Sequence, residues 1–110
     1  MAKELEEKFL SLWKEMFPTL ELKREMKLIK ERKFLFDFVE EESKTVIEIN
    51  GGNWVRGRHS HPMGLDKDYE KIILAAMEGY QVLCLSGKQI TKPYLNKVQY
   101  IMERRGSNLP

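Results

Sequence analysis

The chain has 110 residues, a length that supports one compact domain with a buried core but not two domains of ordinary size. Its composition, 42% hydrophobic and 33% charged, is typical of a globular protein, and no apolar stretch approaches the roughly 20 residues needed to cross a bilayer. The formal net charge of +2 is too small to indicate a polyanion-binding protein by itself. We therefore expect a single domain, 1–110, with no membrane partner.

The N-terminus alternates acidic residues with lysines and lacks the apolar region and small-residue cleavage site of a signal peptide. A cytoplasmic location is therefore expected. The only cysteine, Cys84, lies within the apolar run 80–86, where it has neither a disulfide partner nor the ligand spacing of a zinc site. We expect it to be buried and inert.

Apolar residues recur at intervals of three and four over 3–17, which predicts an amphipathic helix that Pro18 ends. Trp13 falls on this apolar stripe, which favours a position in the core over a role in base stacking. In the segment 20–30, the alternation of apolar and polar residues is compatible with a strand but does not separate two faces cleanly. We predict the first strand there.

Two further strands are predicted at 33–39 and 45–50, and each carries one carboxylate on an otherwise apolar run: Asp37 and Glu48. If the two runs form an antiparallel hairpin about Glu42 and Ser43, the numbers of paired residues sum to 85, and Asp37 faces Glu48. Two carboxylates so close repel each other unless a divalent cation lies between them. Hard oxygen ligands favour magnesium, manganese or calcium over zinc.

Apolar residues on both faces of these strands predict a sheet that is covered on both sides. Strict alternation places three phenylalanines on one face of the second strand, namely Phe34, Phe36 and Phe38. It also places Asp37 and Glu48 together on a partly covered face, where a carboxylate is costly unless it is paired or bound to a metal.

The segment 51–65 is a long connection with several glycines, Trp54, two arginines and two histidines, and connections of this length in a small domain are usually functional or disordered. A helix is predicted at 66–78, with Gly79 as its stop and with these residues facing inward: Tyr69, Ile72, Ile73, Ala76 and Met77. A buried strand at 80–86 and a final helix from Thr91 to Arg105 follow. The order α-β-β-β-α-β-α predicts an α/β (α+β) domain.

Six short motifs occur in order over 24–89: Arg-Glu-Met-Lys-Leu at 24–28, Arg-Lys-Phe-Leu-Phe-Asp-Phe at 32–38, Val-Ile-Glu-Ile-Asn-Gly-Gly-Asn-Trp at 46–54, Gly-Arg-His at 57–59, Asp-Tyr-Glu-Lys at 68–71 and Gly-Tyr-Gln-Val-Leu at 79–83. Together they resemble the PD-(D/E)XK nuclease superfamily, and within it the very-short-patch-repair-endonuclease-like and DUF559-like group. The resemblance implies a restriction-endonuclease-like fold, a four-stranded mixed sheet flanked by helices, which agrees with the predicted order.

The resemblance also implies that Asp37 and Glu48 bind Mg²⁺, with Mn²⁺ as a substitute and the backbone carbonyl of Ile49 as a further ligand. Asn50 departs from the motif, because a lysine stands there in the motif that names the superfamily. The amide of Asn50 could still bind a metal or orient a water as a catalytic residue, but it cannot act as a cationic stabiliser. Lys71 matches a lysine that relatives carry on the following helix and is our first candidate to replace it, although it could instead pair with Asp68 on the same side of that helix.

His59 matches the Gly-Arg-His motif and is a candidate general acid or base, since an imidazole titrates near neutral pH. His61 is a weaker candidate. Arg56 and Arg58 would hold phosphates near the scissile bond, and Trp54 would stack on bases or pack in the core. These residues, with Arg32 and His61, form the expected DNA-binding set.

These expectations describe a Mg²⁺-dependent DNA endonuclease that acts on branched, mismatched or nicked DNA. It would act in the cytoplasm at the nucleoid. A homodimer would supply the two sites needed to cut both strands. A sequence-specific homing or restriction-type endonuclease remains open, because it would have the same core. So does a catalytically silent DNA-binding module, which Asn50 motivates. A structural or partner-binding domain with a merely solvated acidic hairpin is the fourth alternative.

Overall fold

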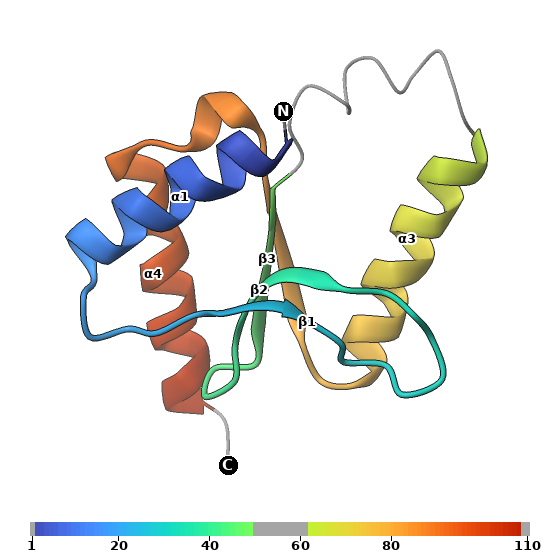
Figure 1. Ribbon diagram of the computed structural model, residues 1–110. Coiled ribbons are helices and arrows are strands. Elements are labelled where there is room, and N and C mark those ends of the chain that lie inside the picture. The colour runs from blue at the N-terminus through green and yellow to red at the C-terminus, as the bar shows by residue number, and fades with distance from the viewer. Residues whose placement is uncertain (1, 50–61, 109–110) are drawn as a thin grey trace.

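The computed structural model describes residues 2–49 and 62–108 and has one mixed four-stranded sheet between layers of helices (Figure 1). The elements follow the expected order. They are α1 (Ala2–Met16), β1 (Lys23–Met26), β2 (Phe36–Glu40), β3 (Thr45–Ile49), α3 (Pro62–Met77), β4 (Gln81–Leu85), a 3₁₀ turn (Gly87–Gln89) and α4 (Lys92–Asn108).

The sheet has the order β1-β2-β3-β4, and only β3 and β4 are parallel. The connection between these parallel strands contains α3, as a parallel crossover requires. The antiparallel pairing of β2 with β3 matches Phe38 with Ile47, Val39 with Val46 and Glu40 with Thr45. Each pair sums to 85, so the hairpin register expected from the sequence is confirmed.

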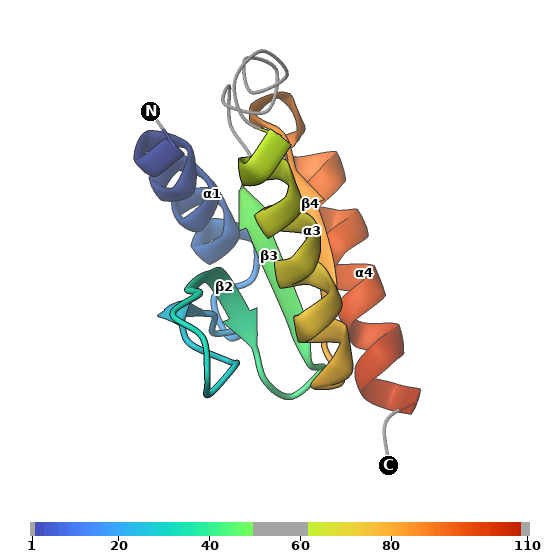
Figure 2. The ribbon, with the colours of Figure 1, turned by 90° about the vertical axis from the view of Figure 1, so that its right-hand side faces the viewer.

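Helices cover both faces of the sheet, as expected. In Figure 1, α1 and α4 lie on one side of the strands and α3 lies on the other. In the view turned by 90°, Figure 2 shows that α3 runs along the sheet. The larger core cluster lies between the sheet and the pair α1 and α4, and its members include Phe9, Trp13, Phe38 and Leu95. Trp13 therefore belongs to the core, as its place on the apolar stripe predicted.

The smaller core cluster lies on the other face, under α3, and includes Phe36, Val39, Val46 and Ala75. Phe36 and Phe38 therefore pack on opposite faces, and the prediction that they share one is wrong. The regular pairing of β2 with β3 starts only at Phe38, and the backbone N–H of Asp37 donates to the side chain of Glu48. Strict alternation therefore does not extend through Asp37.

The inward face predicted for α3 is also wrong. Tyr69, Ile73 and Met77 are 52%, 61% and 75% exposed, whereas Ala75 is fully buried and Leu74 is partly buried. Residues 72–77 are apolar around the whole helix, so their spacing does not select one stripe.

Cys84 is exposed, which contradicts the expectation that it is buried. It lies on β4, an edge strand of the sheet, where an apolar run does not ensure cover on both faces.

Gly79 follows α3 with a φ of 89°, a left-handed conformation that favours glycine, so the predicted helix stop is confirmed. Among the described helices, none is long and apolar enough to span a membrane.

Candidate functional site

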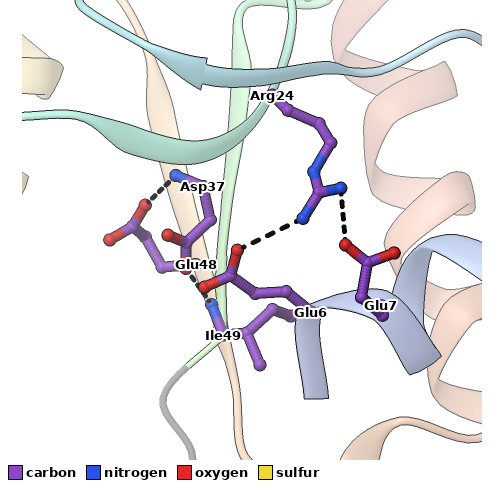
Figure 3. Close-up of polar contacts among 6 residues, drawn as sticks. All are labelled: Glu6, Glu7, Arg24, Asp37, Glu48 and Ile49. Atoms are coloured by element: carbon purple, nitrogen blue, oxygen red, sulfur yellow. Dashed lines mark hydrogen bonds and ion pairs between the residues drawn. The ribbon is translucent and has the colours of Figure 1, made fainter. Parts of the chain in front are cut away.

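Asp37 and Glu48 lie together where the pairing of β2 and β3 ends. The backbone N–H of Asp37 donates to Glu48 Oε2 at 2.7 Å, and the backbone N–H of Ile49 donates to Asp37 Oδ2 at 2.8 Å (Figure 3). Each carboxylate thus bonds to the backbone of the neighbouring strand. These reciprocal bonds fix both side chains at the end of the hairpin.

The protein environment disfavours the charged forms of both carboxylates. Burial raises the pKa of Asp37, and the charge of Glu25 adds to this effect, while the Ile49 N–H and Lys71 oppose it. Burial also raises the pKa of Glu48, followed by the negative charge of Asp37. A cation at this position would relieve the repulsion and favour ionisation of both groups.

Lys71 brings a positive charge to this pair from α3. Its Nζ donates to Glu48 Oε1 at 2.9 Å and to the backbone carbonyl of Leu35 at 2.6 Å, and it lies 4.7 Å from the centre of the Phe36 ring. The Lys71 side chain is 18% exposed. Its ion-pair partner is Glu48, whereas the sequence alternative was a pair with Asp68.

Glu6 on α1 is a third acidic residue near the pair, and it was not among the residues predicted from the sequence. Its side chain is 17% exposed, and its Oε1 lies 3.5 Å from Arg24 Nη2. Burial raises the pKa of Glu6, and the charge of Asp37 is the next cause. The sequence feature that could have indicated Glu6 is its position beside the apolar stripe of the first helix, three residues before Phe9.

Arg24 on β1 ties α1 to the sheet. Its Nη1 donates to Glu7 Oε2 at 2.8 Å (Figure 3). Its guanidinium lies 5.4 Å from the centre of the Phe38 ring. The next residue, Glu25, has a φ of 50°, which is uncommon for a residue other than glycine. The Arg24–Phe38 and Met26–Phe36 pairs flank Glu25 and Asp37, so these two acids occupy neighbouring strand positions.

The donor set fits a hard divalent cation with few protein ligands. Within residues 2–49 and 62–108, no group of three or more His, Cys, Asp or Glu side chains is arranged to hold a metal. Magnesium, however, is commonly bound through one or two carboxylates, with water and substrate phosphate completing its octahedron. Asp37 and Glu48 can supply those two carboxylates, and each oxygen that accepts one hydrogen bond keeps a further lone pair.

Arg32, which was predicted to bind DNA, forms an ion pair with Glu70 of α3. Its guanidinium makes two hydrogen bonds of 2.9 Å to the Glu70 carboxylate and lies 4.5 Å from the centre of the Phe34 ring. It therefore joins the segment before β2 to α3. The other predicted residues lie outside the described part of the chain, namely Asn50, Trp54, Arg56, Arg58, His59 and His61.

Comparison with solved structures finds a similar fold in a chain described as "Homing Endonuclease I-Bth0305I Catalytic Domain". The TM-score is 0.57 with 19% sequence identity, over 91% of this chain and 87% of the other. No family model matches the sequence, and no curated protein does either. The likeness shows that this chain has the fold of an endonuclease catalytic domain, in agreement with the four-stranded architecture expected from the sequence.

Proposed function

We propose that this protein is a metal-dependent DNA endonuclease of the PD-(D/E)XK type. The observation that carries the proposal is the convergence of Asp37, Glu48 and Lys71 at the end of the β2–β3 hairpin. Two carboxylates with raised pKa values and a lysine form a site that suits a divalent cation and a phosphodiester. The fold shared with an endonuclease catalytic domain supports this interpretation.

In this proposal Asp37 and Glu48 hold Mg²⁺, or Mn²⁺ in its place, and the carbonyl of Ile49 is a further ligand. The bound ion would supply charge neutralisation and Lewis-acid assistance at the phosphate. Lys71 is held beside Glu48, and its ammonium would offset charge that develops on the phosphate. His59 is the candidate to move a proton. Hydrolysis would leave a 5′-phosphate and a 3′-hydroxyl.

The proposed substrate is branched, mismatched or nicked DNA. A domain of this size offers little surface of its own for recognising a long sequence, so we propose that it recognises a distorted structure. Arg56, Arg58 and Trp54 are the proposed contacts to phosphates and bases. Cutting two strands would need two such sites, which a homodimer would supply.

Two other functions remain as alternatives. The homing endonuclease domain of similar fold favours a sequence-specific homing-type endonuclease, which would cut one duplex sequence rather than a distorted structure. Asn50, which stands where the motif has a lysine, favours a catalytically silent DNA-binding module. This module would bind DNA but would not cleave it in any divalent metal.

The decisive experiment is a cleavage assay on linear, nicked, mismatched and four-way DNA, with magnesium, manganese or EDTA. We expect metal-dependent cuts on the distorted substrates, and no cuts by Asp37→Ala purified in the same way. Cleavage confined to one duplex sequence would favour the homing-type alternative. DNA binding without cleavage on any substrate would favour the silent module.

A further inference from the structure

A cavity of about 90 Å³ opens next to the carboxylate pair, between α3 and the sheet, and Glu48 and Lys71 both line it. It is larger than the roughly 10–15 Å³ that one water needs, and well below the roughly 300–1,000 Å³ of pockets for drug-sized ligands. The cavity therefore suits a single ring that enters beside the proposed catalytic site.

The apolar lining of this cavity offers surfaces for a flat ring. Phe36 is buried, while Tyr69 and Ile72 are 52% and 37% exposed, and Val82 of β4 also contributes. A side chain such as Tyr69, which has a π-face and remains accessible to solvent, is suited to stacking against a base.

The polar lining of the cavity is mainly acidic. Asp68 and Glu48 both contribute, and Asp68 forms no hydrogen bond or ion pair with another residue of the described segments. Carboxylates repel a phosphate but accept hydrogen bonds from the amino group of a base, as Asp and Glu do from cytosine N4. The cavity thus favours a small ring that carries an amino group.

We propose that this cavity binds the base of a nucleotide next to the scissile phosphate, turned out of the helix stack, with cytosine preferred over thymine. The inference rests on the proposed nuclease function, because that function places the phosphate beside Glu48 and Lys71. A base in mismatched or branched DNA costs less to unstack than a paired one. Base capture would therefore select the distorted substrates proposed above.

The test uses one DNA duplex with a single bulged cytosine, bulged thymine or bulged abasic site, in calcium to suppress turnover. Fluorescence anisotropy should give about five- to a hundredfold tighter binding for cytosine than for the abasic site, the scale of one stacked base, with thymine between them.

Cys84 is the only cysteine of the chain and lines the cavity. The cytosine duplex should slow its alkylation by N-ethylmaleimide severalfold more than the abasic duplex does.

Variants on the cavity wall sharpen the test. Tyr69→Ala should remove most of the difference between cytosine and the abasic site, and Tyr69→Phe should retain it. Tyr100→Ala is the matched control, because Tyr100 is 59% exposed on α4 and does not line the cavity. Asp68→Asn should lower the ratio of cytosine to thymine affinity.

Equal affinity for the cytosine and abasic duplexes, with equal alkylation of Cys84, would overturn the inference. Cleavage of the same duplexes in magnesium separates this failure from failure of the proposed function. A protein that cuts them all at one rate retains the nuclease function and loses the base pocket. A protein that discriminates in binding but never cuts retains the pocket and loses the nuclease function.

Discussion

Lys71 and Glu48 join α3 to the hairpin, with Lys71 Nζ 2.9 Å from Glu48 Oε1. Both side chains are mostly shielded from solvent, at 18% and 13% exposure. The second hydrogen bond of Lys71, to the Leu35 carbonyl, fixes the ammonium at the end of the sheet. Lys71, which comes from a helix, therefore places its ammonium next to the Asp37–Glu48 carboxylate pair.

Lys71→Ala should reduce turnover by roughly ten- to a thousandfold, the scale expected for loss of one positioned charge or donor. DNA affinity should change far less, because the loss concerns the reacting phosphate. The measurement is single-turnover cleavage, with Lys67→Ala as the control, since Lys67 is an exposed lysine on the same helix. Normal cleavage by Lys71→Ala together with failure of His59→Ala would assign the role to the imidazole.

Asp37→Ala and Glu48→Ala should each abolish cleavage while DNA binding stays nearly intact or strengthens. Each substitution removes a metal ligand but also removes a negative charge that repels phosphate. Cleavage and anisotropy measured on one substrate separate the two effects. A rate near that of the wild type in magnesium for either variant would refute the metal-site assignment.

Metal binding should also be visible without DNA. A ligand that binds only the folded state stabilises it, by about 2.7 kcal/mol at a concentration of 100 times its dissociation constant. Magnesium or manganese should therefore raise the melting temperature of the wild type but not that of Asp37→Ala. An equal increase in both proteins would place the bound ion elsewhere.

Asp37→Asn should raise the melting temperature at pH 7 in the absence of metal by a few degrees. The pKa of Asp37 is raised in the folded protein, mainly by burial. Between the unfolded and the folded pKa, the folded state holds a proton that the unfolded state has lost, so stability falls as the pH rises from about 4 through the folded pKa. The advantage of the variant should shrink toward pH 4, which melting curves across this range would check.

The sequence was sufficient to predict the hairpin and its facing carboxylates. Apolar runs on either side of a short acidic turn define the register, and extending that register by one residue places Asp37 opposite Glu48. The resemblance to the nuclease superfamily also indicated Lys71, because relatives carry a lysine on the helix after the long connection. Glu6 was not predicted, because its approach to Asp37 depends on how α1 crosses the sheet.

The error in the inward face predicted for α3 has a physical origin. The apolar residues 72–77 can present several stripes to the sheet, and packing selects the stripe that contains Ala75 and brings Lys71 to Glu48. This choice leaves Tyr69 on the surface. Such a selection depends on contacts between distant segments, which local periodicity does not encode.

DNA affinity should fall steeply with salt, because each phosphate contact by arginine or lysine releases condensed counterions. Replacing Arg56 and Arg58 together by alanine should flatten the plot of log affinity against log salt by about 0.9 for each phosphate that is no longer neutralised. Lys3→Ala with Lys14→Ala is a charge-matched control on α1. An unchanged slope in the arginine variant would mean that these residues do not contact the backbone.

Asn50→Lys tests whether the position after β3 and the helix position of Lys71 serve the same phosphate. If they do, the substitution should be tolerated in the wild type and should partly restore cleavage to Lys71→Ala, because either ammonium can offset the developing charge. Single-turnover cleavage by both single variants and the double variant measures the coupling between the two positions. Asn50→Gln is the control, since it changes size without adding charge. Strictly additive losses would mean that the two positions act independently, and Lys71 would then have a role other than replacing the lysine of the motif.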